Sequence, residues 1–212
     1  MKQILVVFVA FSISVAAMAQ SEKYNGAMSS NLTLLDSAKT ADDFLASSAA
    51  FERIAEAEKN QWLPYYYAAY TQCLYTFVKN DMPNNDSYAD KVDALLAKAE
   101  ALSPNNSEIS VVRSMVATAR MLVSPMDRYQ TYGPAIAKAL EQAKSQDASN
   151  PRPFFIQGQN LRYTPEQFGG GCETAKPILL EAQKKYEAFK PASALHPNWG
   201  KKQLDDLIAG CK

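Results

Sequence analysis

The chain has 212 residues, and its 22 lysine and arginine side chains are balanced by 22 aspartates and glutamates. A chain without a basic excess lacks the electrostatic footprint of proteins that bind nucleic acids or anionic membrane surfaces, so composition argues against both partners. The length and the 47% of hydrophobic residues suffice for one domain, or one array of small units, with a substantial core.

The first 19 residues have the three parts of a secretory signal peptide. Lys2 gives a positive start, residues 4–15 are almost unbroken apolar sequence, and Ala17-Met18-Ala19 is a small-x-small triplet before the expected cleavage point. The apolar run is too short to span a bilayer, and no later run is long enough. We therefore expect a periplasmic or secreted mature protein that does not span the membrane.

Downstream of the signal, apolar residues recur every three or four positions, which predicts helices, and no alternating pattern indicates a strand. Residues 20–39 are a candidate helical segment, and residues 40–212 are the predicted helical domain. The expected helices cover about 40–57, 63–77, 86–102, 107–122, 132–146, 152–163 and 173–189, with a last helix after Trp199.

These helices fall into pairs with an approximate repeat. Small residues at Ala57, Ala99, Ala143 and Ala182 are 42, 44 and 39 positions apart. Spacings of this size are typical of repeat proteins built from helix pairs, in which a small side chain lets neighbouring helices approach closely.

The stretch Ala101-Leu102-Ser103-Pro104-Asn105-Asn106-Ser107-Glu108 resembles the junction between repeats in tetratricopeptide-repeat proteins, and Asn150-Pro151-Arg152 is similar to it. The resemblance covers roughly residues 40–212. The period exceeds the usual 34 residues of that family, and the tryptophan, leucine, glycine and tyrosine pattern of its first helix is largely absent. The resemblance implies an all-α fold in which antiparallel helix pairs stack as a right-handed superhelix, an α-α solenoid.

In that family the concave face is lined by the first helix of each pair and is the natural binding surface. The alternative for these side chains is ordinary packing or a solvated helix face. The candidate binding residues on this face are Tyr66, Tyr67, Tyr70, Arg113, Arg120, Phe155, Gln159 and Arg162.

We therefore predict a non-catalytic scaffold of the cell envelope that binds a protein or peptide through its concave face. The alternative prediction is a small-molecule or anion binder that uses the tyrosine-rich groove or the glycine turn at Gly169-Gly170-Gly171. The glycine turn lacks the Gly-Lys-Ser/Thr ending of a P-loop.

His196 is the single histidine, and no cluster with metal-ligand spacing and no nucleophile elbow accompanies it, so we expect no enzyme, no cofactor and no metal site. Cys172 and Cys211 flank the last helical unit and are a candidate disulfide; the alternative is three unpaired thiols. Cys73 is predicted to be a small buried side chain.

Overall fold

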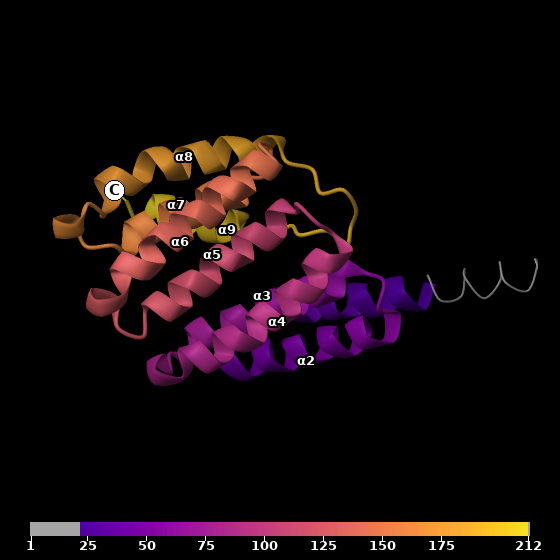
Figure 1. Ribbon diagram of the computed structural model, residues 1–212. Coiled ribbons are helices and arrows are strands. Elements are labelled where there is room, and N and C mark those ends of the chain that lie inside the picture. Colours follow the sequence, from indigo (N-terminus) through magenta and orange to yellow (C-terminus); the bar gives the residue numbers. More distant parts are fainter. Residues whose placement is uncertain (1–21, 212) are drawn as a thin grey trace, which may run out of the picture.

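The computed structural model describes residues 22–211, and all regular structure within that range is helical, as Figure 1 shows. The predicted signal peptide lies outside these residues. Residues 22–37 are helical. The elements that follow are α2 (Ala41–Glu58), α3 (Trp62–Lys79), η1 (Met82–Asn84), α4 (Asn85–Leu102), α5 (Ser107–Met121), α6 (Pro125–Gln146), α7 (Arg152–Tyr163), η2 (Glu166–Phe168), α8 (Cys172–Ala188) and α9 (Lys201–Ala209). The all-α prediction is confirmed.

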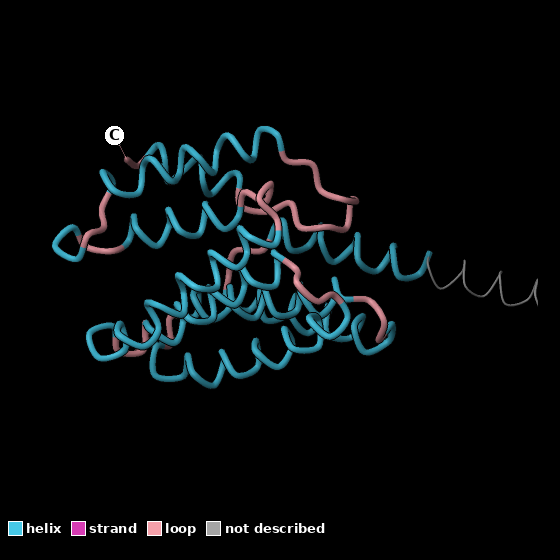
Figure 2. Tube along the Cα trace, turned by 45° about the horizontal axis from the view of Figure 1, so that its top comes forward, coloured by secondary structure: helices cyan, strands magenta, loops and turns pink. Residues whose placement is uncertain are grey.

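The helices pack as antiparallel neighbours. The pairs α2–α3, α3–α4, α5–α6 and α7–α8 are in contact, and α3, α5 and α7 also touch in succession. The connections therefore alternate between two ends of the molecule (Figures 1 and 2). One end holds the α3–α4, α5–α6 and α7–α8 connections, and the other holds the α2–α3, α4–α5 and α6–α7 connections. No helix in residues 22–211 is both long and apolar enough to cross a membrane.

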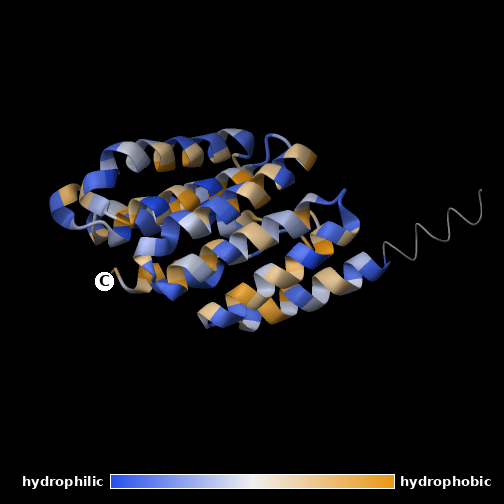
Figure 3. Cartoon of the chain, turned by 60° about the horizontal axis from the view of Figure 1, so that its bottom comes forward, coloured by the Kyte–Doolittle hydropathy of each residue, from blue (hydrophilic) through white to orange (hydrophobic). Residues whose placement is uncertain are grey.

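Figure 3 shows hydrophobic and hydrophilic residues interspersed along each helix, as the spacing of apolar residues every three or four positions predicts. Of the small residues assigned to the repeat, Ala99, Ala143 and Ala182 are fully buried between helices. Ala57 is exposed, and Ala55 occupies the buried position instead. The first repeat is thus shifted by two residues from the predicted alignment.

Helix α6 begins at Pro125, whereas the sequence predicted a start near Tyr132. Gly133 and Pro134 favour a break, because glycine has a low helix propensity and proline has no backbone N–H to donate. The helix nevertheless runs through both residues. Its buried residues all lie in the second half, and in the first half Arg128 donates to Asp86 and to the Arg120 carbonyl.

The C-terminal end of the chain is held by the predicted Cys172–Cys211 disulfide, which is present. It joins the first residue of α8 to the residue that follows Gly210 beyond α9. Cys73 is buried and unpaired.

Candidate functional site

A C-terminal segment covers the face on which we expected the binding residues. We call residues 190–200, which connect α8 to α9, the strap. Its Trp199 ring stacks on the Tyr70 ring at 4.4 Å between centroids, and its Nε1 donates to the Tyr66 hydroxyl at 2.8 Å. The Tyr67 hydroxyl donates to the Leu195 carbonyl at 2.9 Å. The strap therefore covers the face of α3 on which we expected a partner to bind.

A buried arginine anchors the strap. The Arg152 side chain is fully buried and donates to Glu108 at 2.8 Å and to the Pro197 carbonyl. Its guanidinium carbon lies 4.8 Å from the centroid of the Phe189 ring and 5.2 Å from that of Trp199. Burial raises the pKa of Glu108, and the Arg152 charge opposes that rise. Charge-assisted and cation–π contacts therefore converge on one side chain beneath the strap.

Four predicted binding residues lie in the interior as a result. Tyr66, Tyr67, Tyr70 and Phe155 are at most 5% exposed. Desolvation raises the pKa of each tyrosine above its ordinary value, so all three remain neutral phenols. They are core residues, and they form no open surface for a peptide.

The charged candidates face neighbouring helices rather than a common groove. Arg113 pairs with Glu100. Arg120 pairs with Asp90 and with Asp93, and both distances are 2.8 Å. These arginines are therefore occupied by intramolecular contacts.

Gln159 and Arg162 differ from the other candidates. Both are partly exposed, and within residues 22–211 neither Arg162 nor the Gln159 amide makes a side-chain hydrogen bond or ion pair. Both side chains therefore lack a hydrogen-bond or ion-pair partner among the described residues.

The glycine turn offers no free anion-binding amides. The N–H groups of Gly169, Gly170 and Gly171 donate to the carbonyls of Glu166, Pro165 and Leu161. A Cβ at Gly170 would lie 2.0 Å from the Thr164 carbonyl oxygen, which explains the need for glycine there. The turn closes the chain on itself.

Exposed aromatic side chains lie elsewhere. Among the described residues, the exposed large aromatic side chains are Tyr129, Tyr163 and Phe168, and Met126 is 75% exposed. They come from the start of α6 and from the α7–α8 connection, which lie at the same end of the molecule (Figures 1 and 2). We call these four residues the aromatic end. Exposed apolar side chains at one end of a molecule are candidates for a binding surface.

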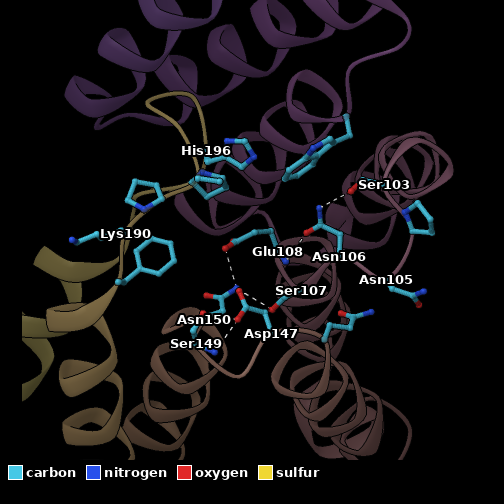
Figure 4. A pocket seen from close by; sticks show the side chains of 17 residues that line it. Ser103, Asn105, Asn106, Ser107, Glu108, Asp147, Ser149, Asn150, Lys190 and His196 are labelled. Atoms are coloured by element: carbon cyan, nitrogen blue, oxygen red, sulfur yellow. Dashed lines mark hydrogen bonds between the residues drawn. The ribbon is translucent and has the colours of Figure 1, made fainter.

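A polar pocket lies at the opposite end, between the strap and the α4–α5 and α6–α7 turns (Figure 4). Its volume is about 460 Å³. His196 lines it, with its Nδ1 within 2.8 Å of the Ser193 hydroxyl and its ring edge-on to Trp62. Burial lowers the pKa of His196. Because this pocket lies at the opposite end of the molecule, His196 is far from the aromatic end.

No protein-family model matches the chain, and no curated protein matches it. A solved structure does: the HusA haemophore from Porphyromonas gingivalis is 36% identical over 89% of this chain and 92% of that chain, with a TM-score of 0.80. This chain belongs to the HusA haemophore family. Identity and coverage of this size reach well beyond a shared helical architecture.

Membership of the HusA haemophore family overturns the predicted peptide-binding scaffold, and the alternative prediction of a small-molecule binder is closer. The strap gives the physical reason, because it fills the face that a peptide would need. Sequence reasoning missed the aromatic end, since Met126 and Tyr129 lie in a stretch that was not predicted to be helical.

Proposed function

We propose that this chain is an exported, non-enzymatic haem-binding protein that holds its ligand against the aromatic end. The observation that carries the proposal is the extended match to a haemophore. Haem is cargo in this proposal, because binding and release require no reaction at the iron.

The side chains of the aromatic end suit a flat tetrapyrrole. Tyr129, Tyr163 and Phe168 offer rings for offset or edge-on contact with the macrocycle, and the flexible thioether of Met126 adapts to an irregular surface. Tyrosine and methionine are also known axial ligands of haem iron. Arg162 precedes Tyr163 and supplies a positive charge for a propionate.

Two further properties form part of the proposal. The pattern of residues 1–19 and the Cys172–Cys211 bridge support export, because disulfides persist in oxidising compartments. The succession of α3, α5 and α7 as inner helices supports a tetratricopeptide-like superhelix whose concave face is closed by the strap.

The test is a haem titration of the mature protein, followed by absorbance in the Soret region. We expect saturable binding by the wild type and a Kd about tenfold higher or more for the double variant Tyr163→Ala/Phe168→Ala, because each lost ring removes about 1 kcal/mol or more of stacking and apolar contact. Leu102→Ala is the matched control, since Leu102 is an exposed apolar residue of α4 at the opposite end.

His196→Ala separates the two ends of the molecule. Binding through the aromatic end predicts an unchanged Kd for this variant. A Kd that rises for His196→Ala while Tyr163→Ala/Phe168→Ala binds normally would move haem to the polar pocket. Absence of saturable binding by the folded wild type would contradict the proposed function itself.

A further inference from the structure

The pocket beside the strap is separate from the aromatic end and has a different chemistry. It is framed by residues from four segments of the chain, and its volume of about 460 Å³ lies in the range of small-ligand sites. In the view of Figure 4, Lys190 and His196 stand on one side and Asn105 on the other, with Glu108 between them. A pocket built from distant segments is held in shape by the fold.

Both carboxylates that line this pocket, Glu108 and Asp147, accept intramolecular hydrogen bonds. Glu108 accepts hydrogen bonds from Tyr66, Asn150 and Arg152. Asp147 Oδ1 accepts from the backbone N–H and the hydroxyl of Ser149, at 2.8 and 2.6 Å. Glu108 is paired with Arg152, whereas Asp147 is exposed and has no ion pair within residues 22–211.

Neutral polar groups remain free in the lining. Within residues 22–211 the Asn105 amide makes no side-chain hydrogen bond, and Gln146 uses only its Oε1, which accepts from Ser110 at 2.7 Å. One ring nitrogen of His196 is also unused. A side-chain amide both donates and accepts, and so does a ligand hydroxyl. The free groups therefore match a neutral ligand with several hydroxyls.

Apolar surface accompanies these polar groups. Trp62 and Phe189 line the same pocket, so a ligand with polar edges and C–H faces can make both kinds of contact. Among the described residues of the lining, Lys190 and Asp147 are the charged groups without an ion pair, and both are exposed, so solvent and salt screen their charges.

We propose that this pocket binds a neutral carbohydrate of one or two sugar units. The free amides of Asn105 and Gln146 hydrogen-bond the hydroxyls, and the rings of Trp62 and Phe189 contact the C–H faces. The same chemistry fits a free sugar and the terminal sugar of a larger glycan. This inference does not depend on the haem proposal, because the two sites lie at opposite ends.

The test uses saturation-transfer NMR and calorimetry on the mature protein with neutral mono- and disaccharides, among them glucose, galactose, N-acetylglucosamine and lactose. Glucuronic acid and an uncharged tripeptide serve as comparison ligands. We expect at least one neutral sugar to bind saturably. A second arm of the experiment uses an asialoglycoprotein to distinguish free sugars from glycan ends. If the protein captures the glycoprotein and the free sugar competes with that capture, the glycan end is assigned as the source.

Two variants locate the binding. Ala192 lines the pocket and is exposed, so Ala192→Trp fills the opening, whereas Ala194→Trp adds the same ring to an exposed strap residue outside the lining. We expect Ala192→Trp to weaken sugar binding about tenfold or more and Ala194→Trp to leave it unchanged. Both variants should bind haem as the wild type does.

Gln146→Glu keeps the shape of the side chain and the acceptor for Ser110, and it replaces the free donor with a negatively charged acceptor. We expect it to weaken sugar binding while the melting temperature is retained. The proposal is overturned if no neutral sugar binds the folded protein, if the tripeptide binds in preference to every sugar, or if Ala192→Trp binds sugar as well as Ala194→Trp does.

Discussion

Arg152 is the residue on which the strap most depends. It brings together Glu108 from α5 and Pro197 from the strap, and these partners are 44 and 45 positions away in the sequence. In the sequence it follows Asn150-Pro151 and is typical of an ordinary turn. Its burial could not be predicted, because the partners that make the burial possible come from other elements.

We predict that Arg152→Ala lowers the free energy of unfolding by about 3–5 kcal/mol, because it leaves Glu108 buried without its counter-charge. Urea denaturation measures the change. Arg162→Ala is the matched control, since Arg162 has no ion pair within the described residues; its expected effect is within about 0.5 kcal/mol. Equal effects of the two substitutions would show that Arg152 has no anchoring role.

At the scale of single helices, α2 shows how much local sequence can fix. Thr40 and Asp43 form a capping box in which each side chain accepts from the other residue's backbone N–H. The predicted start of this helix, near residue 40, agrees with the cap. Helix α6 was predicted less well, because Gly133 and Pro134 disfavour a helix, and propensity alone does not reveal that the helix continues through them.

We expect Thr40→Ala to lower the free energy of unfolding by about 1 kcal/mol, since it removes the oxygen that caps the Asp43 N–H. Thr40→Ser, which keeps that oxygen, should lie close to the wild type. Thermal unfolding of the three proteins checks this. A Thr40→Ser variant as unstable as Thr40→Ala would exclude the cap as the cause.

The same helix predicts a pH dependence. Hydrogen bonds from the Lys39 and Thr40 backbones lower the pKa of Asp43. A carboxyl whose pKa is lower in the folded state stabilises the fold above its unfolded pKa, and that stabilisation is lost as pH falls through the folded pKa.

Asp43→Asn should therefore be less stable than the wild type at neutral pH, and the gap should close in acid. Asp42→Asn removes the same charge from the same turn without these hydrogen bonds. Unfolding of all three proteins between about pH 2 and pH 7, the range in which carboxyl groups titrate, measures this difference in stability. A gap that stays constant with pH, or one that is equal for Asp42→Asn, would refute this origin.

At the scale of the whole molecule, the disulfide holds together the segment that carries α8, the strap and α9. Cys172 and Cys211 are separated by 39 positions. The chain-entropy estimate for a loop of this length is about 4 kcal/mol. We expect Cys172→Ser/Cys211→Ser to lose about that much stability, measured by urea denaturation. Reductant should destabilise the wild type and leave the double variant unchanged; a wild type insensitive to complete reduction would contradict the estimate.

The sequence predicted the helices, the paired arrangement and this disulfide, because the apolar periodicity and the position of the two cysteines on either side of the last helical unit are visible in it. It did not predict where the binding surface lies. The tyrosines near residue 66 looked suitable for a groove, but Trp199 and Leu195 cover them from a segment about 130 positions away. Burial of that kind depends on the completed fold, and so does the exposure of Tyr163 and Phe168.

Hydrogen–deuterium exchange with and without haem tests the central claim most directly, because it locates the ligand without any substitution. We predict that haem slows amide exchange around Met126 to Tyr132 and around Tyr163 to Phe168, and that exchange in the strap stays unchanged. Slower exchange confined to the strap and to α3, with no change at the aromatic end, would contradict the account.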